Sequence, residues 1–221
     1  MKSIFSPDGP LYNLAERLGN LVLLNMLYLL FCIPIVTIGP ASAALRYVTL
    51  KYATNDEDRV FAPFWHSFKQ NLKQGMIIGI VRTAITLFLA YDLYYILVTW
   101  RYISNNTVYD KVILVLVALA CFVYILVSRY IYPMLARYDN STRQLIRTSL
   151  VLAVRHLPAT LCMTLLTAAP IVLMMYTMTS FALVLTFYVF IGFAALAYLQ
   201  DKLIVRIFWQ YTPKEETEKT E

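Results

Sequence analysis

Residues 20–46, NLVLLNMLYLLFCIPIVTIGPASAALR, decide the fold of this chain. The stretch begins as an apolar helix, and Pro34, Gly39 and Pro40 interrupt it where a spanning helix would still lie in hydrocarbon. Proline removes a backbone N–H and so breaks the helical hydrogen-bond ladder. Lipid offers no partner for the freed carbonyls, so the break must face protein or a wet cavity. We therefore expect this stretch to form the protein-facing centre of a membrane domain.

The composition of the whole chain is that of a membrane protein. Of its 221 residues, 60% are hydrophobic and only 14% are charged, and the mean hydropathy is +0.62. Both values lie far from those of ordinary soluble domains. The net charge of +6 is scattered over the loops, which is typical of the positive-inside bias and argues against nucleic-acid binding. We expect an all-α, polytopic helical bundle in a lipid bilayer.

The apolar runs predict one transmembrane domain over residues 1–211, followed by a disordered charged tail at 212–221. Five full spans are expected, at about 19–38, 75–98, 112–132, 159–178 and 181–199. Alternatively, the break at 34–40 folds back, which gives six membrane segments and moves the N-terminus from the outer to the inner side. In both arrangements, the basic connections place the C-terminus in the cytoplasm.

The polar residues of the stretch 20–46 are expected to make structural hydrogen bonds. Thr37 can satisfy carbonyls that Pro40 frees, and Asn25 can cross-link neighbouring helices. The small residues at 41–44 allow close helix approach. The break at Pro34, Thr37, Gly39 and Pro40 is therefore interpreted as a tight packing joint rather than a solute site.

An amphipathic helix follows the polar loop at 55–59. Its apolar stripe, spaced i, i+3, i+4, i+7 and i+11, consists of Phe61, Phe64, Trp65, Phe68 and Leu72. This pattern fits an interfacial helix and equally a docking surface for a partner protein. A second amphipathic stretch near 143–157 also leads into a span, and this weak internal repeat aligns Asn71 with His156.

Arg82, Arg129 and Asp201 form a candidate inner polar cluster. Arg82 and Arg129 lie at similar depths in their spans, and Asp201 is the expected counter-ion for either. One interpretation is an electropositive inner pocket for an acidic ligand or a lipid headgroup. The other, which we favour at this stage, is snorkelling to the headgroups together with one structural ion pair.

No motif of an enzyme or a metal site is present in the sequence. The phosphate-binding loop, the nucleophile elbow, the dinucleotide fingerprint and CxxC are all missing. The three cysteines are isolated in apolar runs, and His66 and His156 stand on separate segments. We expect no catalytic residues, no cofactor and no metal.

The first 75 residues resemble the YesL family of bacterial membrane proteins of unknown function. The resemblance rests on Asn25, on the P-x-V-T-I-G-P break from Pro34 to Pro40, and on Phe64, Phe68, Lys69 and Asn71 of an F-x-x-x-F-K-x-N element. It implies a bacterial plasma-membrane protein, often encoded beside carbohydrate ABC transporters, and hence a non-enzymatic accessory role in sugar uptake or its regulation. A carbohydrate ABC permease is the implied partner.

An autonomous small-solute transporter or channel is the alternative, because broken helices at mid-membrane often mark transport sites. The sequence does not indicate the oligomeric state.

Overall fold

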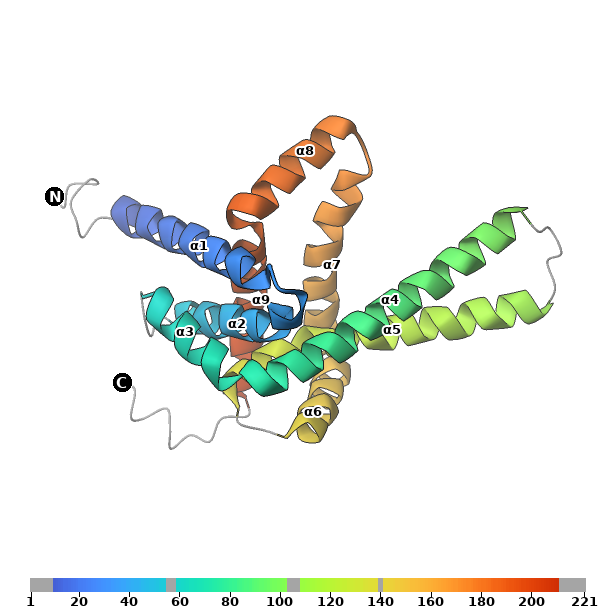
Figure 1. Ribbon diagram of the computed structural model, residues 1–221, viewed down its shortest axis with the longest axis horizontal. Coiled ribbons are helices and arrows are strands. Elements are labelled where there is room, and N and C mark those ends of the chain that lie inside the picture. Colours follow the sequence, from blue (N-terminus) through green and yellow to red (C-terminus); the bar gives the residue numbers. More distant parts are fainter. Residues whose placement is uncertain (1–9, 55–58, 103–107, 139–140, 211–221) are drawn as a thin grey trace.

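The computed structural model describes residues 10–54, 59–102, 108–138 and 141–210, which are helical apart from short turns (Figure 1). The predicted all-α class is confirmed. In chain order the elements are α1 (Pro10–Cys32), η1 (Ile35–Thr37), α2 (Ile38–Thr54), α3 (Phe61–Gln70), α4 (Leu72–Tyr102), α5 (Val108–Arg137), α6 (Thr142–Arg155), α7 (Leu157–Met174), α8 (Met178–Phe187), η2 (Tyr188–Gly192) and α9 (Phe193–Trp209).

Within the described residues, five segments are long and apolar enough to cross a membrane. They are Ala15–Cys32, Leu72–Ile96, Lys111–Arg137, Leu157–Met174 and Met178–Trp209. The number agrees with the five predicted spans, although the bounds differ. The predicted tail at 212–221 lies outside the described residues.

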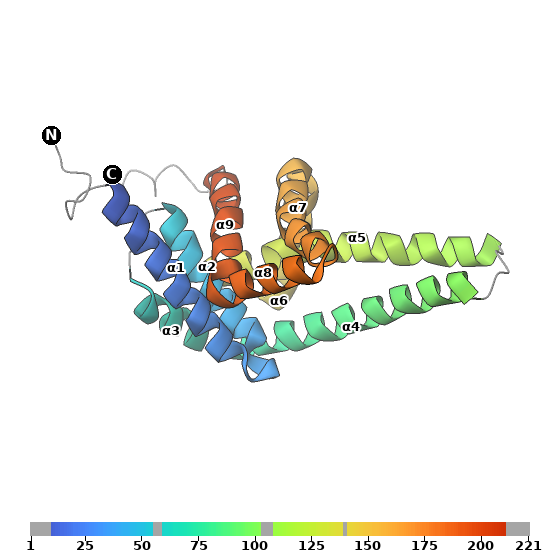
Figure 2. The same cartoon turned by 90° about the horizontal axis from the view of Figure 1, so that it is seen from above.

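The break at 34–40 folds the chain back on itself. Helix α1 ends at Cys32, the single turn η1 follows, and α2 returns alongside α1 (Figures 1 and 2). The candidate span that corresponds to the predicted one at 19–38 is Ala15–Cys32, which ends before the prolines. Of the two arrangements left open by the sequence, the structure adopts the return leg. The start of α1 and the end of α2 consequently lie at the same end of the hairpin.

The return helix α2 is the centre of the molecule. Ten of its 17 residues are buried, and it contacts α1, α3, α4, α5 and α9. Its surroundings are therefore protein rather than lipid, which is what a helix next to a proline break requires. Two apolar clusters meet on it: one with α1, α3 and α9, the other with α5, α6 and α9.

The start of α2 packs directly against α4 through Gly39, Gly75 and Gly79, and we call this contact the glycine joint. A Cβ atom added to Gly39 would lie 1.9 Å from the carbonyl oxygen of Gly75, and one added to Gly79 would lie 2.9 Å from the Cα of Gly39. Gly75 and Gly79 are one helical turn apart, so α4 presents a small-xxx-small face to α2. The break thus serves as a packing joint whose backbones touch directly.

Helices α4 and α5 form a long antiparallel hairpin that extends away from the rest of the molecule (Figures 1 and 2). The bend before α4 lies at Asn71, where α3 ends. Asn71 donates a hydrogen bond to the Ser67 carbonyl at 3.0 Å. His156 occupies the same place between α6 and α7, so both joints of the predicted repeat connect a short amphipathic helix to a long apolar one.

The last span changes direction sharply at the π-helical turn η2, between α8 and α9 (Figure 2). The side chain of Asn25 in α1 hydrogen-bonds backbone groups at this turn. Its amide nitrogen donates to the carbonyls of Tyr188 and Val189 at 3.0 and 2.8 Å, and its oxygen accepts from the Ala194 N–H at 3.1 Å. Asn25 is fully buried, so one side chain supplies the partners that lipid cannot offer to a distorted helix.

Candidate arginine cavity

A fully buried carboxylate anchors α9 to α2. Arg46 donates from Nη1 to Asp201 Oδ1 at 2.9 Å, and the Thr49 hydroxyl donates to the other carboxylate oxygen. Arg46 also bonds the carbonyl of Ala197 and the side-chain oxygen of Gln200. Asp201 is 0% exposed, and its two oxygens have partners, as a buried ion pair needs.

This pairing corrects the predicted role of Asp201. The sequence made it the counter-ion of Arg82 or Arg129, whereas the structure places it against Arg46. Because the break folds back, Arg46 lies on the central helix α2. Arg46 and Thr49, three apart on one helix face, were the signal that the sequence analysis missed.

A cavity of about 310 Å³ lies beside this ion pair at the centre of the bundle. Each of the five candidate spans contributes to its wall, through Tyr28, Arg82, Arg129, Thr167 and Tyr188. Helix α2 adds Ser42 and Arg46. We call this space the arginine cavity, because Arg46, Arg82 and Arg129 all line it.

Arg129 has one guanidinium nitrogen that the described residues leave without a partner. Its Nε atom is buried and has no hydrogen-bond partner among the described residues. Arg46 and Arg82 are near enough to repel it electrostatically. An unpaired charge within an apolar bundle costs several kcal/mol, on the order of the penalty for a buried ion without its counter-ion.

Arg82 is held by aromatic residues of α5. Its Cζ lies 4.9 Å from the centroid of the Tyr132 ring, a cation–π contact. The Tyr124 hydroxyl donates to the Arg82 carbonyl at 3.2 Å and is hydrogen-bonded to Thr86. These contacts fix the arginine in position without neutralising its charge.

The charges of the arginine cavity do not balance. Three guanidinium groups meet there, and Asp201 pairs with one of them. None of the described residues that line the cavity is a carboxylate. The site therefore carries an excess of positive charge, and an anion with several oxygens would match its donors.

Part of the aromatic stripe packs in the interior of the protein. Phe64 and Phe68 are buried, and the Phe31 ring of α1 lies 5.5 and 4.8 Å from their ring centroids. Phe61 and Trp65 remain exposed, at 58% and 36%. The stripe Phe61, Phe64, Trp65, Phe68 and Leu72 is thus partly buried. Its role in docking stays a prediction, for the exposed edge at Phe61 and Trp65.

Thr37 satisfies the end of α1. Its hydroxyl lies 2.7 Å from the carbonyl oxygens of both Phe31 and Pro34. The carbonyls that it serves are thus those of Phe31 and Pro34, and not one freed by Pro40 as expected. Among the described residues, no group of three or more His, Cys, Asp and Glu side chains is placed to hold a metal ion.

The family description "Protein of unknown function, DUF624" matches residues 21–93, which include the break, α3 and Arg82. The "Uncharacterized protein YesL" of Bacillus subtilis (strain 168) is 27% identical over 168 residues, or 74% of this chain and 76% of that protein. Over about three quarters of its length, the chain is thus similar to a YesL-like protein.

A second relative, the "Uncharacterized protein YteU" of the same organism, is 26% identical over 165 residues, or 73% of this chain and 71% of that protein. No solved structure matches the chain significantly. The predicted resemblance to the YesL family is confirmed, and the names of these relatives give no activity. The function must therefore be argued from the arginine cavity itself.

Proposed function

We propose that this protein is a non-enzymatic integral membrane protein that binds an anionic group in the arginine cavity. The observation that carries the proposal is the uncompensated charge of Arg82 and Arg129 in a space that all five candidate spans help to line. A bundle that needed these arginines only for packing would supply each with a counter-ion, as it does for Arg46. An anionic ligand would supply the missing charge.

Anion binding to the purified full chain in neutral detergent tests this function. Inorganic phosphate, glycerol phosphate and phosphatidylglycerol are titrated separately, with binding followed by the shift in Tm and by calorimetry. We expect at least one of them to bind, and binding to weaken roughly tenfold in Arg129→Gln, since a charge-assisted hydrogen bond contributes about 1.5–3 kcal/mol.

Arg143→Gln is the matched control, because Arg143 is an exposed arginine on α6, outside the cavity. If all three anions fail to bind the wild-type chain, the function is wrong.

The protein acts, in this proposal, as an accessory of a carbohydrate ABC permease in the bacterial plasma membrane. The family resemblance supports that partner, and the exposed edge of α3, Phe61 and Trp65, is the surface offered to it. Affinity purification from the native membrane should recover the permease subunits. Recovery of this chain alone from a membrane that contains an intact permease would refute the partnership.

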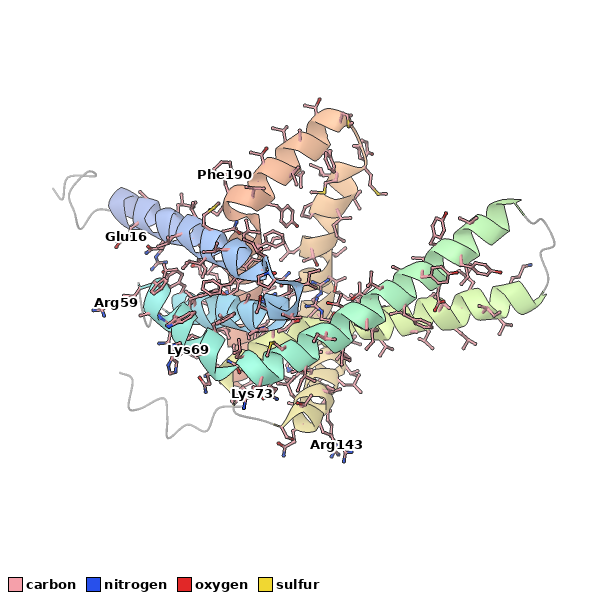
Figure 3. All side chains as sticks on the ribbon, in the orientation of Figure 1. Glu16, Arg59, Lys69, Lys73, Arg143 and Phe190 are labelled. Atoms are coloured by element: carbon pink, nitrogen blue, oxygen red, sulfur yellow. The ribbon has the colours of Figure 1, made fainter. Side chains whose placement is uncertain are left out.

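The C-terminus is proposed to face the cytoplasm. Figure 3 shows Arg59, Lys69, Lys73 and Arg143 along one edge of the molecule, where α3, the start of α4 and α6 lie. A basic edge of this kind fits the cytoplasmic side by the positive-inside rule.

A second candidate function is transport of a small anion by this chain alone. The position of the arginine cavity at the centre of the bundle favours it, because transporter sites lie near mid-membrane between helices. Flux of radiolabelled phosphate into proteoliposomes that contain only this protein separates the two. Binding without flux supports the accessory role, and flux that Arg129→Gln abolishes supports transport.

A further inference from the structure

An apolar groove runs along the α4–α5 hairpin. Its volume is about 760 Å³, and aliphatic side chains such as Ile85, Leu89, Leu116 and Val123 form most of its wall. Many of these side chains are exposed, including Ile85 at 42% and Leu116 at 60%. A groove with this lining excludes water and suits a hydrocarbon chain.

Arg82 belongs to the walls of both spaces. It lines the apolar groove between α4 and α5, and it also lines the arginine cavity. The two spaces therefore adjoin at Arg82: one side offers aliphatic surface, and the other offers Arg129 and Arg46. A ligand that fills both must carry an anionic end and an apolar end.

The position of Arg82 fits this division. Its guanidinium lies over the Tyr132 ring, with Cζ 4.9 Å from the centroid. This aromatic contact leaves the positive charge of Arg82 without a counter-ion. Arg129 contributes a buried Nε that no described residue satisfies. Phosphate oxygens are the acceptors that such donors bind most strongly.

We propose that an anionic phospholipid occupies this composite site, with its phosphate between Arg82 and Arg129 and an acyl chain in the α4–α5 groove. The inference rests on the proposed anion-binding function and adds the class of ligand. A free anion would account for the arginines alone. Only an amphiphile accounts for the aliphatic groove that opens at the same arginine.

The experiment compares an anionic lipid, a zwitterionic lipid and a free anion on the full chain. Native mass spectrometry from neutral detergent measures retention of phosphatidylglycerol and phosphatidylcholine with identical acyl chains, and calorimetry measures inorganic phosphate. Phosphatidylglycerol should be retained roughly tenfold better than phosphatidylcholine, and that preference should disappear in Arg82→Gln and Arg129→Gln but not in Arg143→Gln.

The groove is tested separately by Ala120→Trp. Ala120 lines the groove and is exposed, so the larger ring fills the groove without entering the core. Retention of phosphatidylglycerol should fall at least tenfold, with phosphate binding unchanged. A wild-type comparison of dioctanoyl with dioleoyl phosphatidylglycerol needs no variant: the longer chain should bind more tightly, because each buried methylene adds to the affinity.

The outcomes separate the two proposals. If phosphate binds as tightly as the lipid and neither Ala120→Trp nor chain length matters, the ligand is a free anion, and the lipid inference is wrong while the proposed function stands. Equal retention of both lipids, insensitive to the arginines, indicates ordinary boundary lipid and also overturns the inference. If neither lipid nor phosphate binds, both proposals are wrong.

Discussion

Arg46 and Arg129 line the same cavity, yet they differ in their hydrogen-bond and charge partners. Arg46 reaches a fully buried carboxylate at 2.9 Å and bonds two further oxygens of α9. Arg129 has a buried Nε without a partner among the described residues and is repelled by the two neighbouring arginines. The fold accounts for the first arginine. The proposed anion would account for the second.

The comparison shows which observation identifies a site in a membrane bundle. An arginine in an apolar span is by itself compatible with snorkelling or with a structural ion pair. The presence or absence of a counter-ion within the protein distinguishes a structural arginine from a binding one. Hydropathy does not reveal whether such a counter-ion is present. The following predictions test whether the two sides of the cavity differ as the contacts indicate.

The Asp201→Asn substitution should have the largest effect. It removes the charge that pairs with Arg46 and leaves a buried guanidinium uncompensated, which costs about 3–5 kcal/mol. We expect a much lower yield of folded protein and a lower Tm in detergent. The double variant Arg46→Gln/Asp201→Asn should recover part of the loss, since no charge then remains unpaired. Wild-type stability in the single variant would contradict the assignment.

The Gly39→Ala substitution tests the joint that holds the Arg46 side of the cavity against the Arg82 side. The added methyl would lie 1.9 Å from the Gly75 carbonyl oxygen, so α2 and α4 must separate. Overpacking of this kind costs about 1–3 kcal/mol. Gly19→Ala is the control, because nothing lies within 4 Å of a Cβ there. Equal Tm values for the two variants would mean that the backbones are not in contact.

The Asn25→Leu substitution removes a polar group that, like Asp201, the fold satisfies completely. It deletes three hydrogen bonds to the π-helical turn and leaves two carbonyls and one N–H without their partner. Hydrogen bonds between membrane helices contribute about 0.6–2 kcal/mol, so we expect a loss of about 1–2 kcal/mol by reversible unfolding. Leu23→Ala, on the lipid-exposed side of α1, should cost less.

Hydropathy and helix periodicity were sufficient to predict the fold class, the number of candidate spans and the location of the break. They did not determine whether the break crosses or returns, because charge near the N-terminus is balanced and proline permits both. The return places Arg46 in the centre, and this is the reason that the partner of Asp201 was misassigned. Long-range pairs such as Asn25 with η2 leave no periodic signal in one sequence.

The aromatic stripe of α3 shows the same limit on a smaller scale. Its spacing correctly predicted a helix with one apolar face, but periodicity does not say what covers that face. Phe31, which packs on Phe64 and Phe68, lies at the end of α1. It reaches them only because the chain folds back at the following residues. The candidate pair Arg82 and Arg129 was found from sequence because both interrupt long apolar runs.

The Arg129→Gln substitution should destabilise the protein least and decides whether the two sides of the cavity differ. No described residue satisfies its Nε, so removing the charge gives up little and relieves repulsion from Arg46 and Arg82. We expect the free energy of unfolding without added anion to stay unchanged or to rise, by up to several kcal/mol, because an unpaired charge in an apolar bundle is itself destabilising. Arg46→Gln should instead destabilise strongly, since it leaves Asp201 unpaired. If Arg129→Gln destabilised the anion-free protein as much as Arg46→Gln, Arg129 would be a structural arginine, and the charge argument for a ligand would fail.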